Sequence, residues 1–527
     1  MITNLFFLLF LSTVYSYNIL VYSPSFAGSH TNFMARIADT LTDAGHNVTF
    51  LVPIVDETKK DQLSVKTTKD VVIVEQDEKM RSQVLPVDDD MGQYWETDIT
   101  SENIDTAFTV FTDAVHLACN NFLRNKQVLE EMKSRNFDVG IYEPLSVCGL
   151  GFMHAIGIRK TITATSCVFY DAVVDAIGEP VDFSYVPGQM SASGDEMSMT
   201  EKVENYRMST ALQKLNIFIW DRETRIYNKY LGPQIPDWRD LMADSSLHFV
   251  NSVPYVDYPR LVTQKTVPIG GISVDIQSIK SSVLPKDWSD VLDKKNYNML
   301  ISFGSLVKSK DMPKNWRKSL VEAIKSEPNV TFIWKYESDE VEWAEGVENI
   351  HFSKWVPQTA LLNDHRLTAF LTHGGLGSTN ELAHLGKPAL MIPIFADQIR
   401  NANMLARQGG AKVFRKHDLG NPTEIKKAIN SIVFNQKYKE NAEKLADLLM
   451  NQPTNPKEQV VKYVEFVARF GPFPEMNPRV RHHGFIENNL LDIYSVMYFP
   501  YFVVFVLVLT ISMLGYSKVS VRKVKRD

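Results

Sequence analysis

The chain has 527 residues, 44% of them hydrophobic and 22% charged, with a formal net charge of −6 at pH 7. This length exceeds that of a usual single domain and predicts two domains with accessory segments. The acidic balance, without an extended basic face, argues against nucleic acid as a partner. The cysteines Cys119, Cys148 and Cys167 lack metal-site spacing, although one pair could bridge in an oxidising lumen.

The first segment, residues 1–16, is typical of a cleaved signal peptide. Its apolar run from Leu5 to Leu11 is too short to span a bilayer, and Ser16 is small enough for signal peptidase.

Residues 17–270 are predicted to form an α/β domain. A strand (Ile19–Tyr22), an amphipathic helix at about residues 32–43 and a second strand (Val48–Val52) make a βαβ start. Further strand-like runs follow at Val71–Val74, Val139–Tyr142, Thr161–Thr163 and Leu247–Val250. Residues 271–297, with mixed charge and a proline, are predicted to be an interdomain linker.

Two residues of this domain suit proton transfer. His30 follows the first predicted strand and Glu143 follows the strand Val139–Tyr142, so both lie at carboxyl strand ends. A histidine titrates near neutrality and suits a general base, and a carboxylate can orient its imidazole. The alternatives are a helix-start cap for His30 and a solvated loop charge for Glu143.

Residues 298–450 are predicted to form a second α/β domain. Its expected strands are Asn298–Phe303, Val330–Trp334, Ile350–Phe352, Thr368–Thr372, Ala389–Pro393 and Lys412–Phe414. Alternation with helices favours a parallel, helix-covered sheet in each domain. Residues 451–492 then hold a helix expected to return to the first domain, followed by a membrane-proximal segment.

A glycine-rich loop lies in the second domain. The run Thr368–Thr372 leads directly into His373-Gly374-Gly375-Leu376-Gly377-Ser378, and a helix capped by Ser378 or Thr379 is expected to run to Leu385, before Gly386. Backbone amides at such a helix start can bind a diphosphate. The alternative is a tight strand–helix turn with a hydrogen-bonded histidine.

The stretch around this loop is similar to the signature of the UDP-glycosyltransferases. Trp355-Val356-Pro357-Gln358 lies upstream, Glu381 is on the helix, and Asp397-Gln398 follows the next strand. The likeness is greatest to the membrane-bound UDP-glucuronosyltransferases of animals and covers nearly the whole chain. It implies the GT-B fold, in which two Rossmann-like domains with parallel sheets face each other.

The resemblance also implies roles for the donor-site residues. Trp355 stacks on uracil, and Gln358 and Glu381 hold the ribose. His373, Gly374, Gly375 and the turn to Ser378 bind the diphosphate, with Ser305 of Ile301-Ser302-Phe303-Gly304-Ser305 near the phosphates. Asp397 and Gln398 take hydroxyls of the transferred sugar.

The chain departs from the family pattern at two places. Glu143 stands where the family has the aspartate that partners the histidine. An asparagine common in vertebrate members is missing from the region that Gly377 occupies, which removes one side-chain contact.

The expected activity is that of a UDP-glucuronosyltransferase acting on a hydroxyl of a small lipophilic acceptor. A single inverting displacement gives a β-glucuronoside and UDP, with UDP-glucuronate or UDP-glucose as co-substrate and no cofactor. The run Asp88-Asp89-Asp90 is the one candidate for a metal site, and its place in a polar loop favours a solvated charge run, so no metal is expected. The resemblance also implies a role in detoxification.

Other functions remain open. One is a UDP-glucosyltransferase on lipid, steroid or xenobiotic acceptors, because the matched positions around Asp397 offer no obvious cation for a glucuronate carboxylate. Lys335 and Lys354 are candidates but could equally serve phosphates or solvent. The other is a catalytically inactive membrane protein that binds sugar nucleotides. The acceptor and any homo- or hetero-oligomer are not indicated. The aromatic residues that could line an acceptor pocket, or be core, are Phe108, Phe111, Phe169 and Tyr170.

The C-terminal end predicts a membrane anchor. Residues 493–517 carry no charge, which suits one transmembrane helix of about 20 residues. The basic residues of 518–527 place this tail in the cytosol, giving a single-pass type I protein with lumenal catalytic domains. Lys523 and Lys525 resemble a retrieval signal for the endoplasmic reticulum, or are a plain stop-transfer cluster. Asn47 and Asn329 are then lumenal glycosylation sequons.

Overall fold

The computed structural model describes residues 15–84 and 87–524, without the side chains of 87–90 and 517–524. The signal-peptide prediction for 1–16 therefore falls almost wholly outside the described residues, as do the side chains of Asp88-Asp89-Asp90 and of the basic tail. The chain divides into two compact units, residues 1–476 and 477–527.

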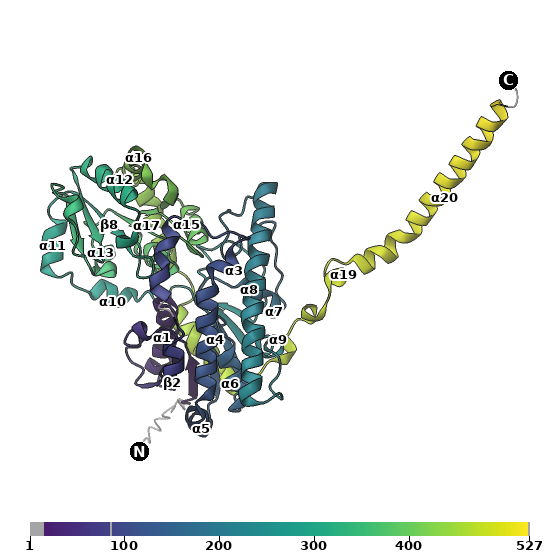
Figure 1. The fold of residues 1–527 in the computed structure, drawn as a ribbon, viewed down its shortest axis with the longest axis horizontal. Helices are drawn as coiled ribbons and strands as arrows, with labels where there is room; N and C mark the ends of the chain where they lie inside the picture. The colour runs from purple at the N-terminus through teal and green to yellow at the C-terminus, as the bar shows by residue number, and fades with distance from the viewer. Residues whose placement is uncertain (1–14, 85–86, 525–527) are drawn as a thin grey trace, which may run out of the picture. The chain divides into compact units, whose positions relative to one another are not determined.

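The first unit contains two parallel sheets, one in each lobe (Figure 1). The N-terminal lobe has seven strands in the order β3-β2-β1-β4-β5-β6-β7. The strands are β1 (Asn18–Tyr22), β2 (Asn47–Pro53), β3 (Asp70–Val74), β4 (Val139–Tyr142), β5 (Thr161–Thr165), β6 (Leu247–Val250) and β7 (Thr266–Pro268). The central strands are buried along nearly their full length, as helix-covered parallel sheets require.

The helices of the N-terminal lobe connect these strands. The long helix α8 lies beside α4 (Figure 1). The helices are α1 (Gly28–Asp43), α2 (Glu78–Arg81), α3 (Ile104–Ala107), α4 (Thr109–Arg124), α5 (Lys126–Ser134), α6 (Cys148–Ala155), α7 (Asp171–Ala176), α8 (Met199–Leu231) and α9 (Trp238–Ala243), with 3₁₀ turns η1 (Glu57–Lys59) and η2 (Val87–Trp95).

The first helix begins earlier than expected. The sequence places its start near residue 32, whereas α1 begins at Gly28, so His30 lies in its first turn. The residue before it, Ala27, is extended and offers no side-chain cap, which is why no capping signal marked the boundary.

The C-terminal lobe has six parallel strands in the order β10-β9-β8-β11-β12-β13. They are β8 (Tyr297–Ser302), β9 (Val330–Lys335), β10 (Ile350–Ser353), β11 (Ala369–Thr372), β12 (Ala389–Met391) and β13 (Ala411–Val413). Its helices are α12 (Lys314–Lys325), α13 (Gln358–Asn363), α14 (Leu376–Leu385), α15 (Gln398–Ala406), α16 (Pro422–Val433) and α17 (Gln436–Met450), with turns η3 (Ser309–Asp311), η4 (Glu342–Ala344) and η5 (Lys416–Gly420).

The segment between the sheets is not extended chain. Two short helices, α10 (Ile276–Ser281) and α11 (Lys286–Leu292), lie within the expected linker 271–297. Asp275 caps α10, since its side chain accepts a hydrogen bond from the backbone of Ser278.

The helix after the second lobe packs on the first. Asn455 is the N-cap of α18 (Pro456–Phe470), and its side chain accepts hydrogen bonds from the backbone N–H groups of Lys457 and Glu458. Its residues Val460, Val464 and Val467 are buried in one hydrophobic cluster with residues of α1 and the central strands. The expected return of this segment to the N-terminal lobe is what the structure has.

The two lobes share further hydrophobic contacts. One buried cluster joins Phe169 and Val256 of the N-terminal lobe to Leu376 and Met404 of the C-terminal lobe. Tyr94 and Trp95, which follow β3 in sequence, are buried in the core of the C-terminal lobe. The two sheets are therefore parts of one compact body.

The second unit contains turn η7 (Arg479–His482), α19 (Phe485–Asn488) and α20 (Leu491–Val524), while turn η6 (Pro474–Met476) ends the first unit. Residues Leu491–Tyr516 of α20 form a 26-residue span whose most apolar 18-residue window has a mean hydropathy of 2.2, and none of the span is buried. By length and composition this is a candidate membrane span.

Candidate active site

The catalytic pair expected from the sequence is brought together. His30 lies in the first turn of α1 and Glu143 directly follows β4, the strand beside β1 in the sheet. The Nδ1 atom of His30 is 2.7 Å from Oε1 of Glu143. The His30 side chain is 19% exposed and that of Glu143 only 1%, so the imidazole reaches the surface while its partner is buried.

Ser166 is a third member of this group and was not predicted from the sequence. It follows β5, the next strand along the sheet, and its Oγ lies 2.6 Å from His30 Nδ1. Its backbone N–H donates to Glu143 Oε1 at 3.2 Å, and the Tyr170 hydroxyl donates to the same oxygen at 3.3 Å. The position of Ser166 immediately after a buried strand was the signal that could have found it.

This geometry assigns the two nitrogens of His30. With Nδ1–H directed at Glu143, the Nε2 atom carries the lone pair that can accept a proton. Burial lowers the pKa of His30, but the charge and hydrogen bond of Glu143, with a further contribution from Asp397, raise it above 6.5 overall. The imidazole is therefore a stronger base than a free histidine.

Asp397 faces this pair from the other lobe. It precedes α15 and follows Ala396, whose φ of 55° is unusual for a residue with a side chain. Asn401 donates to its Oδ2 at 2.9 Å. Burial raises the pKa of Asp397 above its usual value, and the opposing effects of the Asn401 hydrogen bond and the charge of His30 only reduce this shift. His30 and Asp397, which come from different lobes, thus lie close enough for each to influence the pKa of the other.

Gln398 is turned into its own loop. Its Oε1 accepts hydrogen bonds from the backbone of Ile394 at 2.9 Å and Phe395 at 3.2 Å, and the residue is 5% exposed. In this geometry Gln398 shapes the loop that carries Asp397, rather than presenting its oxygen to a sugar.

The glycine loop surrounds the ring of His373. A Cβ atom on Gly304 or on Gly375 would lie 2.7 Å from this imidazole, and Gly304 has a φ of +83°. These glycines are required because the ring occupies the space of their side chains. Burial, together with the charge of Lys335, lowers the pKa of His373 to about 4, so the ring is neutral near pH 7 and donates through an N–H rather than as a cation.

The helix after this loop begins at Leu376, with Gly375 as its N-cap and no side-chain cap. The expected caps, Ser378 and Thr379, lie inside the first turn. The prediction was wrong because the loop needs only the positive φ of Gly374 (+87°) before the helix starts. The helix ends as expected, at Gly386 in the left-handed conformation.

The expected ribose ligands contact each other. Gln358 Nε2 donates to Glu381 Oε2 at 2.6 Å and to Ser378 Oγ at 3.1 Å. Burial raises the pKa of Glu381, and the hydrogen bonds from Gln358 and Thr359 oppose this. Trp355, three residues before Gln358, is 75% exposed, which leaves its ring free to stack. Ser305 is exposed directly after Gly304.

Three cations of the C-terminal lobe, Lys335, Lys354 and Arg400, have carboxylate partners. Arg400, three residues after Asp397, is fully buried and its Nη2 lies 2.7 Å from Asp257 of the other lobe. Lys335 Nζ is 2.9 Å from Glu337 and donates to the carbonyl of Gly304 at 2.8 Å. Lys354 is exposed and lies 2.6 Å from Asp339.

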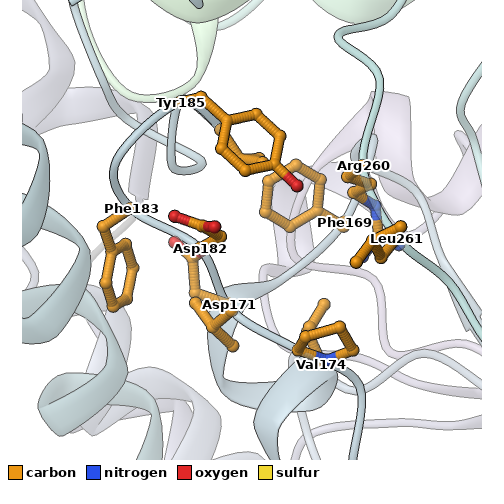
Figure 2. A pocket seen from close by; sticks show the side chains of 11 residues that line it. Phe169, Asp171, Val174, Asp182, Phe183, Tyr185, Arg260 and Leu261 are labelled. Atoms are coloured by element: carbon orange, nitrogen blue, oxygen red, sulfur yellow. The ribbon is translucent and has the colours of Figure 1, made fainter.

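Apolar side chains pack beside His30. Phe26 lies edge-on to the imidazole with centroids 5.4 Å apart, and Phe111 lies edge-on to Phe26 at 5.7 Å, with Phe108 6.3 Å beyond. Phe169 instead lines a separate small pocket of about 50 Å³, shown in Figure 2 with Tyr185, Arg260 and Leu261.

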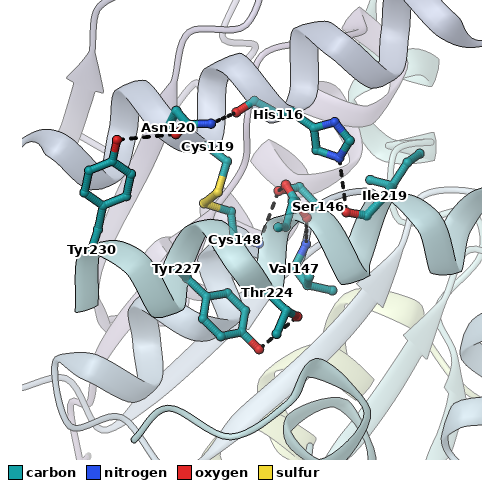
Figure 3. The surroundings of a disulfide bond; sticks show 11 residues. His116, Cys119, Asn120, Ser146, Val147, Cys148, Ile219, Thr224, Tyr227 and Tyr230 are labelled. Carbon is teal, nitrogen blue, oxygen red and sulfur yellow. Dashed lines mark hydrogen bonds between the residues drawn. A yellow bond between two sulfur atoms is a disulfide. The ribbon is translucent and has the colours of Figure 1, made fainter. Parts of the chain in front are cut away.

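The loop that carries Glu143 is fixed from behind by α8. Trp220 Nε1 donates to the carbonyl of Pro144 at 2.8 Å, and Glu223 accepts from Ser146 Oγ and the Val147 backbone, both at 2.6 Å. A disulfide bond joins Cys119 of α4 to Cys148 at the start of α6 (Figure 3). Cys167 is free and buried, so one pair does bridge, as the sequence allowed.

The two sequon asparagines are exposed, Asn47 at the start of β2 and Asn329 before β9. Their partner threonines, Thr49 and Thr331, are each 3% exposed.

Comparison with known proteins gives consistent matches. A family model described as "UDP-glucoronosyl and UDP-glucosyl transferase" matches residues 18–527. A Caenorhabditis elegans protein named "Putative UDP-glucuronosyltransferase ugt-47" is 28% identical over 509 residues, covering 93% of this chain and 92% of the relative. A second C. elegans protein, "Putative UDP-glucuronosyltransferase ugt-56", is 28% identical over 469 residues, covering 87% and 88%.

Solved structures share the fold. A UDP-glucosyltransferase from Polygonum tinctorium superposes with a TM-score of 0.58 at 14% identity, covering 87% of this chain and 100% of that chain. The glycosyltransferase of kitacinnamycin superposes with a TM-score of 0.57 at 17% identity, covering 86% and 99%. With its two parallel sheets, the chain has the GT-B fold that its sequence resemblance implied.

Proposed function

The chain belongs to the UDP-glucuronosyl and UDP-glucosyl transferase family, and from this premise we propose that it transfers glucuronate from UDP-glucuronate to a hydroxyl of a small lipophilic acceptor. The observation that carries the proposal is the pairing of His30 with Glu143 at 2.7 Å, in electrostatic contact with Asp397 of the donor lobe. This proximity supports a base in one lobe acting on a sugar held by the other.

In the proposed reaction, Nε2 of His30 takes the proton of the acceptor hydroxyl as its oxygen attacks the anomeric carbon. The new bond forms as the bond from that carbon to the diphosphate oxygen breaks, so configuration inverts and UDP leaves with the electron pair. Glu143 stabilises the imidazolium that forms. The aromatic wall of Phe26 and Phe111 beside His30 supports a lipophilic acceptor.

The departing diphosphate is proposed to be stabilised without a metal. Backbone N–H groups at the start of α14, together with the neutral His373 ring, supply hydrogen-bond donors where charge develops. Full activity in the presence of EDTA is the expected result, and loss of activity that Mg²⁺ or Mn²⁺ restores would contradict it.

The donor sugar has a second candidate. The names of the relatives support glucuronate. The ion pairs of the donor lobe favour glucose, because a glucuronate carboxylate needs a cation and the candidate cations already have carboxylate partners. These pairs are Lys335–Glu337, Lys354–Asp339 and Arg400–Asp257. The alternative is therefore a UDP-glucosyltransferase on a lipid, steroid or xenobiotic acceptor.

We further propose a type I topology in the endoplasmic reticulum, with the catalytic lobes in the lumen. The apolar span Leu491–Tyr516 supports an anchor, and the Cys119–Cys148 disulfide supports an oxidising compartment for the lobes. Glycosylation at Asn47 and Asn329 and retrieval through the tail belong to the same proposal.

A donor panel tests the function. Microsomes carrying the full chain are incubated with UDP-glucuronate or UDP-glucose and a mixture of phenolic acceptors, and products are identified by mass. A glucuronide is the expected product, and a glucoside selects the alternative donor. A chain that binds UDP but transfers neither sugar would be the inactive binding protein. Microsomes carrying His30→Ala are the matched control.

A further inference from the structure

A pair of buried asparagines connects the two lobes at the active site. Asn251 follows β6 in the N-terminal lobe and is 7% exposed, and Asn380 lies in α14 of the C-terminal lobe and is 3% exposed. Nδ2 of Asn380 donates to Oδ1 of Asn251 at 3.3 Å. This hydrogen bond therefore crosses between the sheets inside the protein, away from bulk water.

The same side chain of Asn251 holds the residue next to the base. Its Nδ2 donates to the backbone carbonyl of Ser166 at 2.8 Å, and its own N–H continues the sheet by donating to Thr165 at 3.1 Å. Ser166 in turn contacts His30 through its hydroxyl and Glu143 through its amide. The carboxamide of Asn251 thus uses both of its polar atoms: Oδ1 accepts from Asn380 of the C-terminal lobe, and Nδ2 donates to Ser166 of the N-terminal lobe.

On the other side, Asn380 belongs to the helix that begins the donor site. α14 starts at Leu376, directly after His373-Gly374-Gly375, and Asn380 immediately precedes Glu381. The helix whose amides would meet the diphosphate is therefore linked through Asn380, Asn251 and Ser166 to His30.

We propose that Asn251 and Asn380 are positioning residues, which fix the base relative to the anomeric carbon of the bound sugar. The inference rests on the proposed transferase function. Neither asparagine contacts the imidazole or the glycine loop in any hydrogen bond described above, so they act through Ser166 and through α14. An in-line displacement depends strongly on the distance between its reacting atoms, which is what such a link controls.

The test uses the full-length protein in microsomes and the variants Asn251→Ala, Asn380→Leu and the double variant. Leucine keeps the volume of Asn380 and removes its hydrogen-bonding groups. Each single variant is expected to lower kcat by about 10- to 100-fold with the KM for the UDP-sugar unchanged. The double variant is expected to lose no more than the more damaged single variant, because both changes break one link.

Asn403→Ala is the matched control. Asn403 also crosses between the lobes, donating to the carbonyl of Ala192 at 2.8 Å, but it has no part in the chain to Ser166. Its kcat and KM are expected to match the wild type. An equal loss of kcat in this control would overturn the proposal, since any loosening between the lobes would then suffice.

Multiplicative losses of kcat in the double variant, or a change confined to KM, would also overturn the inference. UDP binding by calorimetry and the melting temperature establish that each variant is folded. If Asn251→Ala does not fold, Asn380→Ser, which shortens the side chain beyond reach of Asn251, gives the same comparison from α14. Wild-type protein that transfers neither sugar defeats the proposed function, whereas active wild type with unchanged variants defeats only the positioning role.

Discussion

Nδ1 of His30 lies 2.7 Å from Oε1 of Glu143, which is one methylene longer than the aspartate that the family resemblance implies at this position. Ser166 and Tyr170, which both follow β5, donate hydrogen bonds to the same carboxylate oxygen and so fix its position. Glu143 is therefore placed where it can play the orienting role that we propose for it.

Replacement of His30 tests the assignment of the base. His30→Ala is expected to lower kcat by about 10²- to 10⁴-fold, because general-base assistance is lost. UDP affinity by calorimetry should stay at the wild-type value, since the donor residues lie in the other lobe. Retained transfer would mean that another group accepts the proton.

The pH profile tests the role of Glu143. The base must be neutral to act, so kcat/KM should rise with pH as His30 loses its proton, with a midpoint above 6.5. Glu143→Gln removes the chief influence that opposes burial, and the midpoint should then move to lower pH while the plateau falls. Glu143→Asp should keep the wild-type midpoint more closely. If the midpoint is the same in all three proteins, Glu143 does not influence the pKa of the catalytic base.

Trp355 is expected to supply affinity rather than rate. Base–aromatic stacking contributes about 1–3 kcal/mol, so Trp355→Ala should raise the Kd for UDP by about 5- to 150-fold. Its 75% exposure means that the melting temperature should not change. Phe434→Ala, an exposed aromatic of the same lobe that contacts Tyr297, is the control and should bind UDP normally.

Glu223 is expected to make stability fall as pH rises. Burial raises its pKa from 4.5 to about 8, more than the hydrogen bonds from Ser146, Val147 and Cys148 lower it. Between pH 4.5 and about 8, Glu223 is protonated in the folded chain and ionised in the unfolded chain. The free energy of unfolding should therefore decrease as pH rises through this range, by at most about 1.4 kcal/mol per pH unit. Above about pH 8 the stabilising effect of the proton on Glu223 is lost.

Urea unfolding across this pH window checks the slope. Glu223→Gln keeps an amide in place of the protonated acid, so its curve should be flatter than that of the wild type. Equal slopes in the two proteins would show that Glu223 is ionised in the folded state.

The cysteines report the compartment of the lobes. Denatured protein, isolated from microsomes without reductant, should react with one equivalent of maleimide at Cys167 and with three after reduction. Three reactive thiols without reductant would contradict the lumenal topology, because the Cys119–Cys148 bond would then be absent in the cell.

Much of this architecture was accessible from sequence because strand and helix patterns are local. The run Thr368–Thr372 and the glycines after it predicted a strand, a loop and a helix. Even there, the helix start was misplaced at Ser378 or Thr379, since a glycine N-cap gives no polar signal.

Contacts that depend on strand order were not accessible. Ser166 and Asn251 follow β5 and β6, and only the order of the sheet shows that these ends lie beside Glu143 and α14. Gln398 was predicted as a sugar ligand from its position, but the bonds from Ile394 and Phe395 that turn it inward depend on the path of the loop. Such side chains are directed by tertiary structure rather than by local pattern.

The packing of α18 on α1 has a consequence for biogenesis. Val460, Val464 and Val467 cover the apolar side of the first helix, yet they emerge from the ribosome after both sheets have been synthesised. The N-terminal lobe is thus synthesised first, but its core is completed last. Until α18 packs on it, the apolar side of α1 is available to chaperones. Premature termination before Pro456 should leave both lobes present but the packing of the N-terminal lobe incomplete, which favours quality-control degradation.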